Sequence, residues 1–161
     1  MLKYRKAEVT MKKDVLIVLR SIQSVDNEQN ETELITPAVF TPLKDGGFSI
    51  AYNETEATGF EGSKTVLSCY GNKRASICRS GSVSSNLIID KDKKQHCLYG
   101  TPYGDLMVGI YTHSIINELN EDGGNLYMKY TVDINSSYVS DNEIFVRVQV
   151  PASEESPENQ S

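Results

Sequence analysis

Two glutamates at the end of a strand pattern are the residues of this chain whose types and spacing could do chemistry. The alternation places Phe48, Ile50 and Tyr52 on one strand face, and Glu54 and Glu56 continue that face. Same-face neighbours lie roughly 6–7 Å apart along a strand, which is comparable to the separation in glycosidase carboxylate pairs. The alternative is a solvated rim, which we prefer because two acids on one strand are seldom catalytic. The sequence therefore predicts no catalytic residue.

Arg79 is the cation that we consider as a partner of Glu54. A carboxylate and a guanidinium inside a barrel end can form a bidentate pair that orients a polar ligand. The simpler hypothesis, which we prefer, is that Glu54 and Arg79 pair with each other or with solvent at the rim and only fix the strand register. An ideal two-residue turn at Gly71-Asn72, after a four-residue turn, would place Arg79 on the face opposite Glu54. One bulge would reverse that assignment.

The elements that must position these residues are short strands separated by turn signals, a pattern typical of an antiparallel sandwich or barrel. The clearest inward face is predicted at the end of the chain and consists of Leu126, Met128, Tyr130, Val132 and Ile134. Residues 113–119 fit either one helical turn that plugs the barrel or a longer strand. About ten strands with almost no helix indicate an all-β meander.

Several short motifs follow one another in a fixed order along the chain. They are Tyr52-x-Glu54, Thr58-Gly59-x-Glu61-Gly62-x-x-Thr65, Arg79-Ser80-Gly81, Tyr99-x-x-x-Tyr103-Gly104-x-Leu106, Thr112-x-Ser114-Ile115 and Gly124-x-Leu126-x-x-x-Tyr130. In this order and spacing, from about Lys13 to Val150, the chain resembles the YwiB-like family of small bacterial proteins, a domain of unknown function. The resemblance implies a single antiparallel meander closed into a calycin-like, lipocalin-related β-barrel of eight to ten strands, in a cytoplasmic setting. It implies no activity and no catalytic residues.

Composition narrows the class of protein further. The chain has 161 residues and a net charge of −6, without a marked basic cluster. We therefore expect no nucleic-acid partner, because such a partner requires a positive field. No signal peptide and no membrane segment is predicted, which favours a soluble, cytoplasmic protein. We expect one barrel domain at 12–150, an N-terminal extension at 1–11 and a disordered acidic tail at 151–161.

Metal and cofactor chemistry find little support in the sequence. Cys69, Cys78 and Cys97 form neither an even set nor a CxxC pair, and they stand among apolar or β-prone residues. His96 and His113 lie near no acid or cysteine at metal-ligand spacing. We expect buried, reduced thiols, no metal and no cofactor.

The leading functional hypothesis is a non-catalytic barrel that binds one small molecule of unidentified chemistry, as lipocalins do. The candidate ligand-binding residues are Tyr52, Glu54, Arg79, Tyr99 and Tyr130. The alternative hypothesis is a module for protein–protein interaction or self-association. It would use a barrel face or a strand edge, and the protein would be a monomer or a homodimer. A hydrolase is the weakest hypothesis, so the sequence favours a protein that is not an enzyme.

Overall fold

The computed structural model describes residues 11–82, 84–101 and 103–151. The predicted N-terminal extension and acidic tail fall almost entirely outside these ranges, so both remain predictions. Within the described residues, ten strands and one short 3-10 helix follow one another along the chain. They are β1 (Lys13–Val25), β2 (Glu28–Pro42), β3 (Phe48–Asn53), η1 (Glu56–Thr58), β4 (Ser63–Tyr70), β5 (Arg74–Gly81), β6 (Ser85–Asp90), β7 (Gln95–Thr101), β8 (Gly104–Asn120), β9 (Gly123–Ile134) and β10 (Ser137–Gln149).

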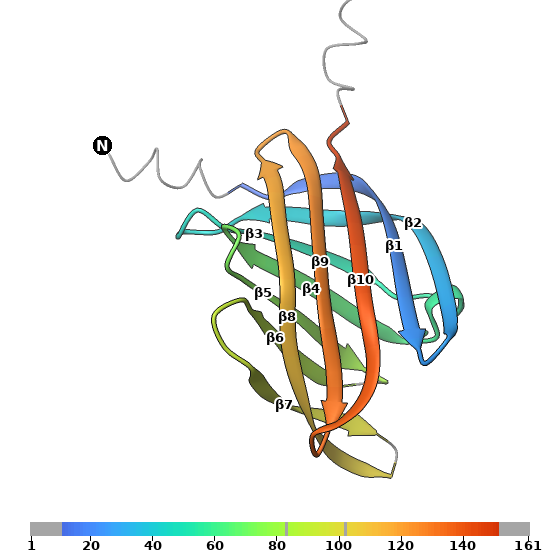
Figure 1. Cartoon of the computed structure of the whole chain (residues 1–161). Helices are drawn as coiled ribbons and strands as arrows, with labels where there is room; N and C mark the ends of the chain where they lie inside the picture. Colours follow the sequence, from blue (N-terminus) through green and yellow to red (C-terminus); the bar gives the residue numbers. More distant parts are fainter. Residues whose placement is uncertain (1–10, 83, 102, 152–161) are drawn as a thin grey trace, which may run out of the picture.

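The ten described strands form one closed antiparallel barrel in which each strand pairs with its neighbour in sequence. The pairing of β1 with β10, from Leu16 opposite Gln149 to Ser24 opposite Asp141, closes the sheet. Figure 1 shows the long strands β8, β9 and β10 as one wall, with β3 to β6 crossing behind them. Among the described strands the sheet therefore closes on itself, although β6 and β7 are paired only at Ser85 opposite Tyr99. The predicted all-β meander barrel is therefore confirmed.

The barrel interior is filled mainly by the apolar members of the alternating patterns. In β9, Leu126, Met128 and Tyr130 are buried, whereas Lys129 is exposed. This confirms the inward face predicted for that part of the strand, and it follows from the two-residue period of side chains on a strand. Val132 and Ile134 are only half-buried because they line a cavity at the end of the barrel.

Residues 113–119 adopt the strand alternative. They belong to β8, which pairs with β9 from Val108 opposite Ile134 to Asn120 opposite Gly123. The register shifts between Thr112 and Ser114, which is the mark of a β-bulge. The extra residue restores the inward direction for Ile115, which is buried. A helical turn in this segment is wrong, because the strand pairing satisfies backbone groups that a single turn would leave open.

The turn between β4 and β5 decides which residues of β5 face inward. Tyr70 lies opposite Arg74, so Gly71, Asn72 and Lys73 form a three-residue turn, one residue longer than the ideal two-residue turn. Gly71 has a φ of 59°, a left-handed conformation that glycine adopts without steric cost. The added residue turns Arg79 inward, onto the face of Glu54, and turns Cys78 outward. The expectation of opposite faces is therefore wrong, as is the expectation that Cys78 is buried.

The cysteines permit a direct test of redox indifference. Cys69, Cys78 and Cys97 are all free thiols, and burial raises the pKa of the Cys69 thiol to about 11. A thiol with a raised pKa is a poor nucleophile at neutral pH. We expect addition of a reducing agent to leave the thermal unfolding midpoint unchanged, and zinc to be absent from purified protein at stoichiometric amount. A shifted midpoint, or one zinc per chain by elemental analysis, would contradict this expectation.

Candidate functional site

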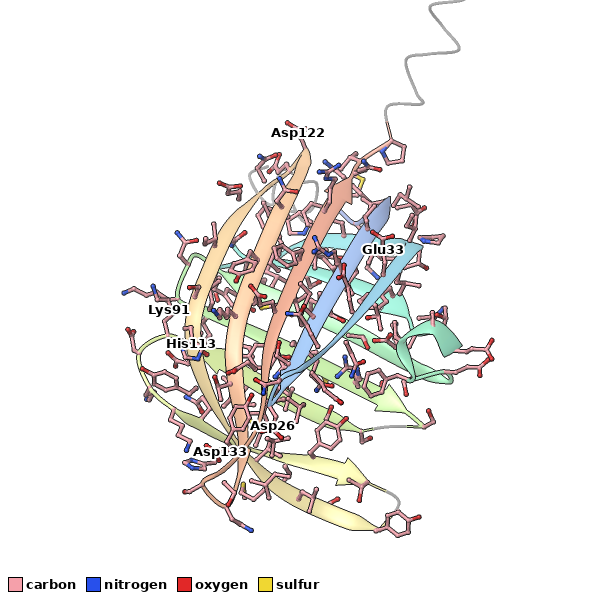
Figure 2. All side chains as sticks on the ribbon, turned by 45° about the vertical axis from the view of Figure 1, so that its right-hand side comes forward. Asp26, Glu33, Lys91, His113, Asp122 and Asp133 are labelled. Atoms are coloured by element: carbon pink, nitrogen blue, oxygen red, sulfur yellow. The ribbon has the colours of Figure 1, made fainter. Side chains whose placement is uncertain are left out.

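A cavity of about 420 Å³ lies inside one end of the barrel. Figure 2 places Asp26 and Asp133 toward one end of the molecule and Asp122 at the other. The cavity belongs to the end with Asp26, since Gln23, Asn30 and Ile134 help to line it. This volume falls in the range of sites that enclose small organic ligands. A barrel of this size can thus hold a ligand in addition to its packed core.

A row of inward-facing residues crosses the wall of this end of the barrel. Strand register aligns Tyr52 with Thr65, Thr65 with Arg79, Arg79 with Ser85, and Ser85 with Tyr99. Five neighbouring strands, β3 to β7, each contribute one residue. Every member carries a polar group, whereas the next inward layer holds Ile50, Leu67, Ile77 and Leu87. The sheet therefore changes from an apolar to a polar interior at this row.

Glu54 lies one residue beyond β3 and is the anion next to the row. Its side chain is 1% exposed, and that of Arg79 is 14% exposed. Glu54 Oε1 accepts a hydrogen bond from Thr58 Oγ1 at 2.7 Å, and Oε2 accepts one from Thr65 Oγ1. Arg79 Nε lies 3.5 Å from the same Oε2. Two hydroxyls and one guanidinium therefore compensate the buried carboxylate, as a buried charge requires.

The connection between β3 and β4 covers this ion pair from one side. It contains η1, whose C-cap Gly59 has a φ of 85°, and it places the Phe60 ring 4.0 Å from the Arg79 guanidinium carbon. Arg79 is thus held between a carboxylate and an aromatic face, an arrangement that favours a cation. The connection also packs tightly on β5: a Cβ on Gly81 would lie 2.4 Å from the Gly62 carbonyl oxygen. Only glycine fits at that position.

The five candidate residues divide between two neighbouring hollows. Arg79, Tyr99 and Tyr130 line the main cavity. Tyr52 and Glu54 instead line a void of about 60 Å³, and Arg79 belongs to both hollows. Burial raises the pKa of the Tyr52 hydroxyl, and the neighbouring Glu54 carboxylate raises this pKa further. The structure therefore brings all five residues to one end of the barrel, with Arg79 between the two groups.

Tyr130 provides a pH-dependent test of this geometry. Burial raises the pKa of Tyr130 to about 12, against a lowering contribution from Arg79. The pKa of Tyr130 in the folded protein lies above the ordinary value of 10. The protonated phenol therefore contributes fully to the free energy of unfolding below pH 10, and this contribution is lost as the pH rises toward 12. At about 1.4 kcal/mol per pKa unit, the loss is about 3 kcal/mol. We expect the free energy of unfolding of the wild type to fall more steeply over this window than that of Tyr130→Phe. Parallel curves in urea denaturation would contradict the burial of this phenol.

The sequence did not predict a role in the site for several of its residues. Thr58 and Thr65 belong to one of the short motifs. That motif indicated a turn followed by the start of a strand, and it did not indicate that these threonines bind a carboxylate. The Ser85 Oγ and Thr112 Oγ1 atoms are buried and have no hydrogen-bond partner within the described residues. The alternation of Ser85 with the buried Leu87 and Ile89 would have placed Ser85 inside. Nothing in the sequence indicated that its hydroxyl would remain unpaired.

The arrangement argues against acid–base chemistry at the two glutamates. Glu56 lies in η1 and is exposed, so it has left the face that Glu54 occupies. Glu54 itself is occupied by three donors, which leaves it poorly placed to accept a proton from a substrate. No group of three or more potential metal ligands exists within the described part of the chain. Its helical structure also includes no segment that could cross a membrane.

The fold and the site define a closed ten-strand barrel, counted over the described residues, with a polar row and a cavity at one end. Residues 17–146 match the sequence model of a family described as Domain of unknown function (DUF1934). The chain belongs to this family. The match confirms the resemblance that the order and spacing of the short motifs indicated.

A solved structure agrees with this assignment. The crystal structure of the ywiB protein from Bacillus subtilis aligns with a TM-score of 0.76 and 17% sequence identity, covering 91% of this chain and 99% of that one. At this identity the likeness concerns the fold alone. A search of curated proteins finds no significant match. The comparisons therefore supply a family and an architecture, and the function must be argued from the site.

Proposed function

We propose that this protein is a non-catalytic barrel that binds one small molecule in its end cavity. The single observation that carries the proposal is the cavity of about 420 Å³, bordered by Arg79, Tyr99 and Tyr130. Ligand sites in proteins are typically hollows of this size in which a few polar groups interrupt an apolar lining. A chain that only needed a stable barrel would gain from filling such a space, because empty volume lowers stability.

A cavity-filling substitution tests the proposal. Val132 lines the cavity and is half-buried, so Val132→Phe should occupy part of the space. Ile116→Phe is the matched control, since Ile116 is 52% exposed on β8. Native mass spectrometry of freshly purified protein should detect a bound small molecule in the wild type and in Ile116→Phe, but not in Val132→Phe. Equal retention by all three proteins, or none in the wild type, would contradict binding in this cavity.

A second candidate function, self-association or binding of another protein, is favoured by one specific feature. Leu98 and Met107 lie opposite each other on β7 and β8, and both are about half exposed. Tyr111 on β8 is also exposed. Exposed apolar side chains that gather on adjoining strands are typical of interaction surfaces. The same mass spectra distinguish the two candidates, because a homodimer without a bound molecule would favour this one.

A further inference from the structure

Arg79 brings more hydrogen-bond donors to the cavity than the described residues around it pair with. A guanidinium carries five N–H donors and no acceptor. Within the described residues, only Nε of Arg79 meets an acceptor, at 3.5 Å from Glu54 Oε2. The four N–H groups on the two Nη atoms are therefore available at the cavity that Arg79 lines. Glu54 also accepts hydrogen bonds from Thr58 and Thr65.

Hydroxyl groups near Arg79 add to this excess. The phenols of Tyr99 and Tyr130 line the cavity, and neither forms a hydrogen bond within the described residues. Ser85, 7% exposed, lies between Arg79 and Tyr99 in the polar row, and Thr112, 6% exposed, lies opposite Tyr130. Both of their hydroxyls lack a partner in the described structure. Buried polar groups in folded proteins are normally paired. Since Arg79 can only donate and the hydroxyls can donate or accept, a hydrogen-bond acceptor supplied from outside the chain would satisfy the groups that line the cavity.

Much of the remaining cavity wall is apolar and fits a hydrocarbon, although polar side chains such as Gln23, Asn30 and Asn142 also line the cavity. Its inward side chains include Leu87, Leu106, Val108, Ile110, Val132 and Ile134. Leu106 is 41% exposed and lies at the outer end of β8, whereas Ile110 is fully buried deeper in that strand. The cavity thus combines the hydrogen-bond donors of Arg79 with a largely apolar wall. A ligand that satisfies both features is amphiphilic.

The charge of the site limits the polar head of this ligand. Arg79 is the one inward-facing cation among the described cavity residues, and Glu54 lies next to it. Glu143, the other charged residue at the cavity, accepts a hydrogen bond from Tyr127 OH at 2.5 Å. Because Arg79 already offsets the charge of Glu54, each negative charge of a ligand adds to the cost of burial, and a monoanion brings fewer such charges than a dianionic phosphate. A planar monoanion matches the fork of the guanidinium.

We propose that the cavity takes a small amphiphilic monocarboxylic acid, whose carboxylate binds Arg79 and the hydroxyls of Tyr99 and Tyr130. The apolar body of the acid lies against the hydrocarbon wall that begins at Leu106. This inference rests on the proposed small-molecule function and specifies its ligand class. Ser85 and Thr112 do not line the cavity themselves but lie next to these three residues in the strand register.

Three probes of equal length and different charge test the inference: octanoate, octanamide and octylamine. Isothermal titration calorimetry on the full chain at pH 7 should show octanoate binding at least ten-fold more tightly than octanamide, with octylamine weakest. Tyr130→Phe should reduce the ratio of octanoate to octanamide affinity several-fold. In the double variant Glu54→Gln with Arg79→Met, which leaves no buried carboxylate unpaired, the ratio should fall to about one. Circular dichroism establishes that each variant is folded.

The possible failures are distinguishable. If octanoate and octanamide bind with equal affinity to the wild type, the carboxylate inference is overturned and the proposed small-molecule function stands. The inference is also overturned if the double variant keeps the full preference for octanoate. If none of the three probes binds, the inference fails, and the proposed function fails with it when native mass spectra of the wild type also show no bound molecule. If phenyl phosphate binds tightly and octanoate does not, the donors around Arg79 bind a phosphate group, which would likewise overturn the inference.

Discussion

Met128→Asp is expected to abolish stable folding of this barrel. Met128 is fully buried at the centre of β9 and packs in the apolar core. An aspartate there would be an unpaired charge without water or a partner, and the cost of burying it should exceed about 4 kcal/mol. Since small domains are stable by only about 5–15 kcal/mol, the remaining stability should be small or absent. Val146→Asp, on the neighbouring strand β10, should behave in the same way because Val146 is 2% exposed.

Two matched variants separate the effect of burying a charge from the effect of any substitution in β9. Met128→Leu keeps the volume and should cost less than about 1.5 kcal/mol. Asn125→Asp introduces the same charge on the exposed face of β9, opposite Arg147, and should change stability by no more than about 0.5 kcal/mol. Urea denaturation followed by circular dichroism gives these values. A soluble Met128→Asp protein with the wild-type melting temperature would refute the assigned inward face.

The second large effect is expected at the Glu54 and Arg79 pair. Arg79→Met removes the cation and leaves the Glu54 carboxylate, which is 1% exposed, with two hydroxyl donors. Breaking a buried pair in this way costs about 3–5 kcal/mol, and the contact distance of 3.5 Å favours the lower end. Glu54→Gln should cost less, because Arg79 retains the Phe60 ring and access to the cavity. The double variant should recover much of the loss, which gives a coupling of at least about 1 kcal/mol.

The exposed pair of Arg20 and Glu31 is the control for this cycle. Their side chains are 45% and 52% exposed, so solvent screens the interaction. Arg20→Met and Glu31→Gln should each change stability by less than about 1 kcal/mol, with little coupling. Melting curves of the four proteins in each cycle are sufficient. Small, additive effects at Glu54 and Arg79 would mean that their charges face solvent, which would remove the basis for an ordered site at this end of the barrel.

The interior of β9 shows how far sequence pattern reaches. Alternation at Leu126, Met128 and Tyr130 specified an inward face, because side chains on a strand point to opposite sides with a period of two. The same rule carried the face of β3 through Tyr52 to Glu54. It also led to the barrel class, since ten such patterns without a helix of comparable length can bury their apolar sides only against one another. These conclusions depend on local spacing, which the sequence contains in full.

The sequence by itself determined which strands exist and which of their faces are apolar, together with the residue types that gather at the site. The tertiary structure decided how those faces combine. One additional turn residue, Lys73, brought Arg79 inside and Cys78 outside, because register across a turn depends on its length and not on the strands. Pairing with β9 made residues 113–119 a strand, and the turn into η1 removed Glu56 from the face of Glu54. The cavity, and the unpaired hydroxyls of Ser85 and Thr112 in the barrel interior near it, arise only when all the strands close, since empty volume is a property of packing and is not encoded at any single position.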